Sequence, residues 1–311
     1  HFIYALGNAP ATIDAAKFFK MRLEQESKGT LSCDIYTDNV LGSERELLEG
    51  CQFGNYDIVL ATNATVASFE NDIFCLDIPW LFDNKQQVYE VLDGPLGDRL
   101  ADGLEESGFK LLQWQENGFR TLSTNKPIND MSDLKGVKIR IMENELQLQQ
   151  WKDYGANPTP MAFTELFTAL QQKTVDAQDN GAELTWQTKF YEVQSHYTYT
   201  KHIYSPYLIL MSKDKFDGLT PEQQEIVLKV SDEAVAYERQ RCDEYEQTAL
   251  DNIKNCGTMQ YSDLTPEVKA EMVKACKNIK ELAYKKVTDP SVVDLLYDEV
   301  AKAKEKFPEE G

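Results

Sequence analysis

Histidine is scarce in this chain, and the sequence patterns of several enzyme classes are absent. Only His1, His196 and His202 occur among 311 residues, which is little material for a zinc site or a Ser-His-Asp triad. The 16 glycines form none of the GxGxxG, GxxxxGK[ST] or GxSxG patterns that hold dinucleotides, nucleotide phosphates or a nucleophilic serine. We therefore expect no catalytic residues, no metal ion and no cofactor, and a protein that is not an enzyme.

Long apolar runs are also missing. The longest ones, such as residues 58–61 and 207–211, are far shorter than the about 20 residues that a membrane-spanning helix needs. The sequence begins with His1 rather than methionine, which we interpret as the mark of an exported chain whose signal peptide has been removed. The expectation is a protein that is itself soluble.

Positive charge is in deficit. The chain has 32 Lys and Arg against 52 Asp and Glu, a formal net charge of −20. Such a field repels nucleic acid, so we expect no nucleic-acid partner. If the ligand is an anion, a local cationic site has to overcome this general repulsion.

The cysteine pattern points to no metal site. The six cysteines form no CxxC pair and match no zinc spacing. Buried free thiols are the expectation, while one or two disulfides stay open.

What is present is an alternation of strand-like and helix-like segments. An apolar run at residues 2–6 and an expected buried strand at 57–61 flank a stretch at 11–27 whose apolar residues recur at helical spacing. A second block follows residue 127, with a strand expected at 137–142. Strands that alternate with crossover helices form an α/β sheet. Because 311 residues exceed the usual single core, we expect two lobes.

One helix is predicted to be unusually long, from residue 221 to residue 255. Thr220 suits the N-cap, Pro221 suits the first helical position, and Gln223 completes a capping box. At a rise of 1.5 Å per residue the helix would be about 50 Å long and would span both lobes. The lobes themselves are expected at residues 1–123 plus 206–250 and at residues 124–205 plus 251–311.

Arg140 is a candidate for anion binding. It alternates with Lys138 along a strand whose other face carries Val137 and Ile139. Its guanidinium offers a planar fork that can donate two parallel hydrogen bonds to one carboxylate. From spacing alone, a surface arginine paired with one of the chain's own acids is the commoner case, and that alternative stays open.

Recognisable motifs follow one another along nearly the whole chain. They are residues 41–46 (LGSERE), 53–57 (FGNYD), 77–82 (DIPWLF), 114–120 (WQENGFR), 133–140 (DLKGVKIR), 158–163 (PTPMAF), 164–172 (TELFTALQQ), 175–180 (VDAQDN) and 189–194 (KFYEVQ). In this order they resemble the solute-binding proteins of tripartite ATP-independent periplasmic (TRAP) transporters, the DctP family. The resemblance implies a two-lobed, periplasmic-binding-protein-like α/β fold with two β-sheets flanked by helices.

The resemblance also implies roles for individual residues. Arg140 matches the arginine that clamps the ligand carboxylate, and Arg120 matches a second arginine near the same group. Asn180 matches the asparagine that completes carboxylate recognition. Phe163 matches an aromatic residue that packs on the ligand, and Tyr207 lies where a strand at the hinge often contributes a side chain. The chain departs from the family around Asn180, where Asp179 replaces the usual Glu and Gly181 the usual Pro, which leaves the ligand's identity in doubt.

Polar residues at the expected strand ends suggest which acid is bound. The further polar candidates are Asn8, Thr62, Asn63 and Glu143, and Trp186 offers the flat apolar face that a sugar ring often needs, although each also has an ordinary structural interpretation as a turn, cap or exposed residue. Together they favour a polyhydroxylated acid, and our lead is a hexuronate such as glucuronate or galacturonate. Sialate, C4-dicarboxylates and 2-oxo or amino acids stay open.

The expected function is that of an extracytoplasmic or periplasmic subunit that delivers an organic acid to TRAP membrane permease subunits of the DctQ and DctM type. Two other functions stay open on the sequence alone. One is an enzyme on the same scaffold, a lyase or transferase, and the other is a ligand sensor for a receptor. Whether the protein is free or lipid-anchored is not decided by the sequence.

Overall fold

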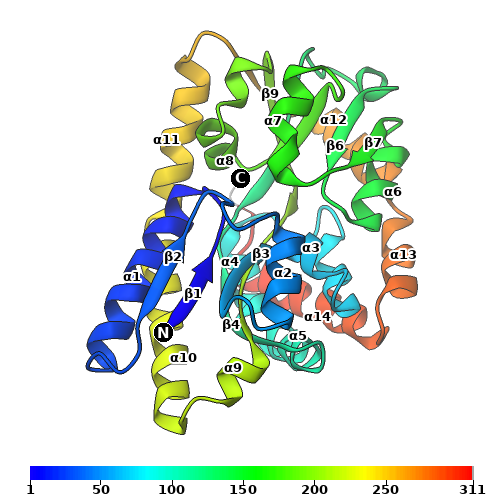
Figure 1. Cartoon of the computed structure of the whole chain (residues 1–311). Helices are drawn as coiled ribbons and strands as arrows, with labels where there is room; N and C mark the ends of the chain where they lie inside the picture. Colours follow the sequence, from blue (N-terminus) through cyan, green and yellow to red (C-terminus); the bar gives the residue numbers. More distant parts are fainter. Residues whose placement is uncertain (310–311) are drawn as a thin grey trace.

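The computed structural model describes residues 1–309 and contains two β-sheets, each flanked by helices (Figure 1). This confirms the predicted α/β, two-lobed architecture. The first sheet has the strand order β2 (Cys33–Tyr36), β1 (Phe2–Ala5), β3 (Ile58–Thr62), β10 (Tyr207–Ser212), β4 (Phe109–Gln115). The second has the order β11 (Gln260–Asp263), β9 (His196–Tyr204), β5 (Phe119–Thr124), β8 (Ala177–Asn180), β6 (Lys138–Ile141), β7 (Asn157–Pro160).

Helices connect and cover these strands. The α-helices are α1 (Pro10–Glu26), α2 (Glu44–Gln52), α3 (Asn63–Val66), α4 (Lys85–Leu92), α5 (Pro95–Glu106), α6 (Glu145–Asp153), α7 (Phe163–Gln171), α8 (Ala182–Gln187), α9 (Lys213–Asp217), α10 (Pro221–Arg239), α11 (Cys242–Asn255), α12 (Pro266–Ala275), α13 (Ile279–Lys286) and α14 (Ser291–Lys306). The described residues also form short 3-10 helices, namely η1 (Asn71–Asp77), η2 (Met131–Leu134) and η3 (Phe190–Glu192). The capping box at Thr220 is present as predicted, and a second one at Ser43 fixes the start of α2.

Parallel pairing within each sheet directs strand ends toward one region. Strand β1 pairs in parallel with β2 and β3, and β6 pairs in parallel with β7 and β8. All five residues of β3 are buried, as expected for a strand covered on both faces. The carboxyl ends of these strands carry the loops where ligands of α/β proteins bind.

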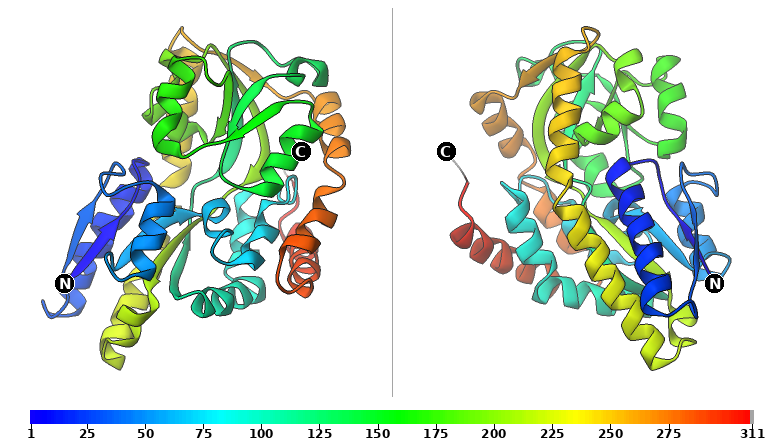
Figure 2. Two further views of the ribbon diagram at one scale, coloured as in Figure 1. Left: turned by 45° about the vertical axis from the view of Figure 1, so that its right-hand side comes forward. Right: turned by 90° about the vertical axis from the view of Figure 1, so that its left-hand side faces the viewer.

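The chain passes between the two sheets at adjacent points. It leaves the first sheet after β4 through residues 116–118 and returns to it through residues 205–206. The two crossings are hydrogen-bonded to each other, because the Ser205 amide donates to the Gly118 carbonyl at 3.2 Å. A third crossing is helical and runs along the outside of the molecule (Figure 2, right).

This third crossing is interrupted, so the prediction of one continuous helix over residues 221–255 is wrong in that detail. Helix α10 ends at Arg239 and α11 begins at Cys242. The amide of Arg241 donates to the carbonyl of Glu238, three residues back, at 2.8 Å, which tightens the turn and breaks the α-helical ladder. The pair still spans both lobes, since α10 packs on α1 and β4 while α11 packs on α8 and β11.

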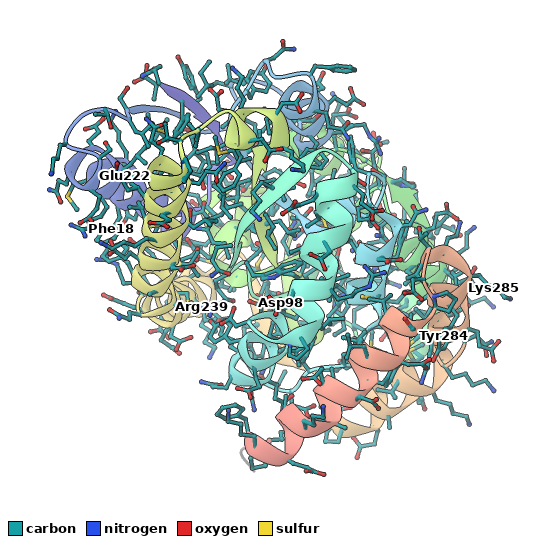
Figure 3. The ribbon with its side chains drawn as sticks, turned by 90° about the horizontal axis from the view of Figure 1, so that it is seen from below. Phe18, Asp98, Glu222, Arg239, Tyr284 and Lys285 are labelled. Atoms are coloured by element: carbon teal, nitrogen blue, oxygen red, sulfur yellow. The ribbon has the colours of Figure 1, made fainter. Side chains whose placement is uncertain are left out.

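The contact of α10 with α1 is closed by aromatic stacking. Seen from below, Phe18 of α1 lies beside α10, which carries Glu222 near its start and Arg239 at its end (Figure 3). The ring of Phe18 stacks on that of Tyr237 with centroids 4.7 Å apart. This stacking holds α1 of the first lobe against α10.

Segments near the expected lobe boundaries pack as follows. Strand β5, residues 119–124, pairs with β8 and β9 of the second sheet. Helix α14 packs on α4, α5 and η1. A division that followed the sheets would therefore place β5 in the second lobe and α14 against the first, and the ranges given above stay a prediction.

Two sequence-based expectations concern the cysteines and the membrane. All six cysteines are free, and five of them are buried. Within residues 1–309, no helix combines the length and apolar character needed to cross a bilayer.

Candidate ligand-binding site

A cleft with about 710 Å³ of open volume is lined by residues of both lobes. The first lobe contributes the ends of β1 and β3, the start of α2 and the start of β10. The second contributes the ends of β6 and β8 and the start of α7.

Arg140 is a buried cation at this cleft without a carboxylate partner. It lies on β6 and is only 2% exposed. Its Nε donates to the carbonyl of Met161 at 2.9 Å, and within residues 1–309 no carboxylate oxygen lies within 4 Å of its guanidinium. Burial, together with the like charge of Arg120, lowers the pKa of Arg140 to about 10, so the group remains charged at neutral pH. A buried, unpaired charge is costly, which makes this position suited to an incoming anion.

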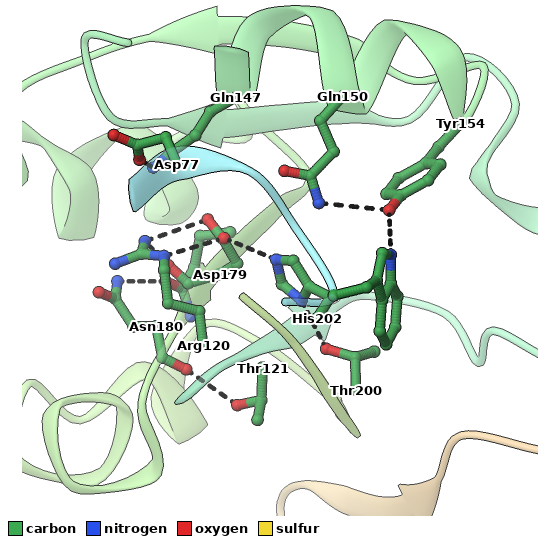
Figure 4. Close-up of polar contacts among 12 residues, drawn as sticks. Asp77, Arg120, Thr121, Gln147, Gln150, Tyr154, Asp179, Asn180, Thr200 and His202 are labelled. Carbon is green, nitrogen blue, oxygen red and sulfur yellow. Dashed lines mark hydrogen bonds and ion pairs between the residues drawn. The ribbon is translucent and has the colours of Figure 1, made fainter. Parts of the chain in front are cut away.

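Arg120 is held by a neighbouring carboxylate. Its Nε donates to Asp179 Oδ2 at 3.0 Å and its Nη2 to Asp179 Oδ1 at 3.1 Å, while His202 Nε2 contacts Asp179 Oδ2 at 3.1 Å (Figure 4). Although burial alone would raise the pKa of the Asp179 carboxyl, the charge of Arg120 and these hydrogen bonds hold it well below its usual range. Within residues 1–309, Arg120 Nη1 has no hydrogen-bond partner, so Asp179 orients the guanidinium and leaves one nitrogen free.

Asn180 is placed by a chain of buried amides and hydroxyls. Its Nδ2 donates to Gln178 Oε1 at 2.6 Å, Gln178 Nε2 donates to Ser123 Oγ at 2.7 Å, and Ser123 Oγ donates to Gln194 Oε1 at 2.9 Å. Each of these four residues is at most 3% exposed. Within the described residues, Asn180 Nδ2 donates to Gln178 Oε1 alone, and Asn180 lines the cleft, so the amide is held in place and its second hydrogen is able to donate.

Two aromatic residues border the same cleft. Phe163 is the first residue of α7 and packs edge-on against Phe190, with ring centroids 6.3 Å apart. Tyr207 begins β10 and pairs with Thr62 of β3, which directs both residues to the lining. Together they supply apolar surface on both sides of a polar centre.

The remaining polar lining comes mainly from the first lobe. Asn8 follows β1, and its Oδ1 is buried without a hydrogen-bond partner within residues 1–309. Thr62 Oγ1 donates to Glu44 Oε2 at 2.6 Å. Glu143, past the end of β6, lies at the rim and pairs with Arg45 of the opposite lobe, Nε to Oε2, at 3.4 Å.

Two sequence candidates do not line this cleft. Asn63 is fully buried in α3, where its Oδ1 accepts a hydrogen bond from Ser205 Oγ at 2.7 Å. Trp186 stacks on Tyr191 with ring centroids 4.3 Å apart, in a separate apolar cluster. Neither residue belongs to the lining of this cleft, and Asn63 Nδ2 is buried without a hydrogen-bond partner within residues 1–309, so a role for either residue in binding stays a prediction.

The sequence reasoning missed other polar lining residues, among them Glu44, Arg45, Thr65 and Asn117. In the sequence, Glu44 was noted only within the motif at residues 41–46. A search for polar residues that follow each expected strand would have found Glu44, since Glu44 begins the helix that follows β2.

A second, smaller cavity adjoins the cleft. It shares Asn117, Leu184 and Tyr207 with the main lining and also contains Lys85 and Glu183. Glu183 Oε1 accepts a hydrogen bond from the Ala11 amide, near the start of α1, at 2.8 Å. This contact links α8 of the second lobe to α1 of the first.

A family profile covers most of the chain. The profile described as bacterial extracellular solute-binding protein, family 7, DctP, matches residues 4–286. The chain is 36% identical over 251 residues to the 2,3-diketo-L-gulonate-binding periplasmic protein YiaO of Escherichia coli, an alignment that covers 80% of this chain and 76% of that protein.

Two solved structures have the same fold over nearly their whole length. The sugar acid binding protein DctPAm from Advenella mimigardefordensis, in complex with galactonate, has a TM-score of 0.93 and 31% identity, and the match covers 97% of this chain and 98% of that one. A TRAP periplasmic solute binding protein from a Sulfitobacter species, with bound β-D-galacturonate, has a TM-score of 0.89 and 26% identity over 95% of this chain and 99% of its own.

Proposed function

The chain belongs to the DctP family, the bacterial extracellular solute-binding proteins of family 7 that serve TRAP transporters, and on this premise we propose its ligand and mode of capture. The protein binds one organic acid in the cleft between its lobes, outside the cytoplasm, and delivers it to the membrane permease subunits. The ligand is a sugar acid, with a hexuronate such as glucuronate or galacturonate as the lead.

The observation that carries this proposal is the unpaired guanidinium of Arg140. A ligand carboxylate placed against it restores the interactions that burial removed, and Arg120 Nη1 and Asn180 Nδ2 supply further donors. Each hydrogen bond to a charged group contributes about 1.5–3 kcal/mol. Three of them account for much of the about 8 kcal/mol that micromolar affinity requires.

The rest of the proposed site suits a polyhydroxylated ligand. Asn8 and Thr62 are polar groups able to bond to hydroxyls, and Phe163 and Tyr207 offer flat surfaces to a carbon skeleton. Glu143 closes the rim through its pair with Arg45. The galactonate and galacturonate bound by the two similar structures are acids of this kind.

The test is a thermal-shift screen of the purified protein against hexuronates, aldonates, sialate, C4-dicarboxylates, 2-oxo acids and amino acids. A ligand at 100 times its Kd stabilises the folded state by about 2.7 kcal/mol. We expect a clear rise in Tm with sugar acids, then saturable one-to-one binding by calorimetry and recovery of the ligand unchanged after prolonged incubation. If no carboxylate raises the Tm, the proposal fails, and conversion of the ligand would point to an enzyme instead.

A further inference from the structure

Glu183 of the second lobe is held against the first lobe at the edge of the smaller cavity. It lies in the first turn of α8, and its Oε1 accepts a hydrogen bond from the amide of Ala11, near the start of α1, at 2.8 Å. The cavity is lined by residues of α1, α4 and β10 from the first lobe and of α8 from the second. Separation of the lobes therefore breaks this hydrogen bond and brings the Glu183 carboxyl into contact with water.

The main cleft adjoins this cavity, and a pair between the lobes closes its rim. Arg45 of the first lobe and Glu143 of the second lie 3.4 Å apart, Nε to Oε2. Because the lining of the cleft comes from both lobes, entry of a ligand requires the lobes to move apart and then to close around it, a hinge motion known from periplasmic binding proteins. Capture of a ligand is therefore coupled to burial of Glu183.

The smaller cavity has an excess of acidic groups. Its lining contains three carboxyls, those of Glu116, Glu183 and Glu246, and the cation of the lining is Lys85. The Nζ of Lys85 lies 2.7 Å from Glu246 Oε2 and 2.8 Å from Asp243 Oδ1, so its charge is already paired. Within residues 1–309, no Lys, Arg or His nitrogen lies within 4 Å of the Glu183 carboxyl. An ionised Glu183 would therefore be an uncompensated charge when the lobes are closed.

The other titratable groups around the cavity supply no positive charge to Glu183. Tyr207 of β10 and Cys242 of α11 line the cavity, and burial raises the pKa of each, so both stay neutral near pH 7. Glu238 of α10 accepts a hydrogen bond from the Glu116 amide at 3.2 Å, and burial raises the pKa of Glu238 as well. The lining residues of α1 are uncharged.

A proton on Glu183 removes the uncompensated charge. Burial raises the pKa of Glu183 to about 7, and the like charges of Glu116 and Glu246 act in the same direction. The Ala11 amide and the charge of Lys85 oppose this shift without cancelling it. When the lobes are apart, water solvates the carboxyl and its pKa returns to the ordinary value of 4.5. The neutral acid is also a donor, and Glu116 Oε1, buried without a hydrogen-bond partner within residues 1–309, is an acceptor in the same cavity.

We propose that closure of the lobes on a ligand takes up a proton at the Glu183 carboxyl, so that affinity for the organic acid rises as the pH falls through neutrality. This inference rests on the proposed function and adds a means of regulating the same site. The closed form holds the proton more tightly than the open form. Binding is therefore strongest below the pKa of the open form and weakens as the pH rises through the pKa of the closed form.

The experiment is calorimetry with galacturonate at pH 6 and pH 8, or with the tightest-binding acid of the thermal-shift screen if galacturonate does not bind. Titrations at pH 6 in two buffers that differ in enthalpy of ionisation, neither of them a carboxylate, count the protons taken up. The wild type is expected to take up about one proton per ligand at pH 6 and to bind about tenfold more tightly at pH 6 than at pH 8.

Glu183→Gln separates this carboxyl from other buried acids, such as Asp77, whose pKa burial also raises to about 7. The variant keeps an oxygen for the Ala11 amide and needs no proton. Its proton uptake at pH 6 should therefore be lower than that of the wild type by about one, and at pH 8 it should bind more tightly than the wild type. A purely structural role of Glu183 would instead weaken binding at both pH values.

The matched control is Glu192→Gln. Glu192 is exposed on η3 and lines neither cavity, so this variant changes the net charge equally and should bind and take up protons as the wild type does. The melting temperature of each variant reports whether it folds.

The outcomes distinguish the inference from the proposed function. If the wild type binds an organic acid without taking up protons, the inference is overturned while the proposed function stands, and this measurement needs no variant. Equal proton uptake by the wild type and a folded Glu183→Gln protein assigns the proton to another group and overturns the role of Glu183. If no organic acid binds at either pH, the proposed function itself fails.

Discussion

Arg120 and Asp179 form a two-point ion pair inside the protein, with Nε and Nη2 of the arginine 3.0 and 3.1 Å from the two carboxylate oxygens. The side chains are 2% and 1% exposed. The pair therefore lies in a low-dielectric region, where loss of one partner leaves an uncompensated charge.

We expect Asp179→Asn to lower the free energy of unfolding by about 3–5 kcal/mol, the usual penalty for removing one member of a buried pair. Urea denaturation of the ligand-free protein measures it. As a control, Asp217→Asn breaks an exposed pair with Lys213 and should have a much smaller effect. Near-equal stability of the two variants would show that Asp179 does not compensate Arg120.

The pH dependence of the same pair has a definite sign. Because the pKa of Asp179 is held below that of an unfolded Asp, its contribution to stability is present above about pH 4 and is lost as the pH falls further. The difference in unfolding free energy between wild type and Asp179→Asn should therefore shrink on acidification below this value. A difference that grew on acidification would contradict the assignment.

Arg140→Lys should weaken binding of the ligand by about 2–5 kcal/mol, because a point charge cannot replace a planar fork that also anchors to the Met161 carbonyl. Calorimetry with the acid found in the thermal-shift screen measures the change. Arg22→Lys is the matched control: Arg22 pairs with Glu26 and with Glu233 of α10 and does not line the cleft, so the Kd should be unaltered. An affinity within twofold of wild type would remove Arg140 from the site.

Glu183 is expected to make stability depend on pH near neutrality. Burial raises its pKa to about 7 from 4.5, so the folded protein retains a proton that the unfolded chain has released. Between these values the contribution of Glu183 to stability falls as the pH rises. Glu183→Gln carries no such proton, so its stability relative to wild type should increase from pH 4.5 to 7 and level off above. Urea titrations across this range test it, and a constant difference would mean that Glu183 is ionised throughout.

Phe163→Ala and Trp186→Ala should separate binding from structure. Phe163 lines the cleft, so its truncation should weaken ligand binding with a limited effect on Tm. Trp186 packs on Tyr191 outside the lining, so its truncation should leave the Kd unchanged and lower stability. Truncation of a fully buried aromatic residue typically lowers the free energy of unfolding by about 3–5 kcal/mol. The decrease for Trp186→Ala should be smaller, because Trp186 is only partly buried. A weaker Kd in Trp186→Ala would return this residue to the site.

Local signals in the sequence predicted local features of the fold well. The capping box at Thr220 depends on residues three apart, and it forms as expected. The strand-end criterion placed Asn8, Thr62 and Glu143 at the cleft, because parallel strands expose their carboxyl ends at one edge.

Features that depend on distant pairing were not predictable in this way. Arg120 meets Asp179 across 59 residues of sequence, and only the antiparallel register of β5 with β8 brings them together. Trp186 was expected at the ligand because of its side chain alone, whereas its direction is decided by contact with Tyr191. The break at residues 240–241 lies within a continuous helical pattern and follows from a single shortened turn.

The position of β10 determines the order in which this protein can fold. In the first sheet β10 lies between β3 and β4, and β4 has no other strand partner in that sheet. Residues 207–212 must therefore be synthesised, and the second sheet's strands up to β9 must already have emerged, before the first lobe can complete its core. A fragment that ends at residue 205 lacks β10, the strand that joins β3 to β4 in the first sheet. We therefore expect the first lobe not to fold before residues 207–212 are available. Its long-range contacts predict slow folding.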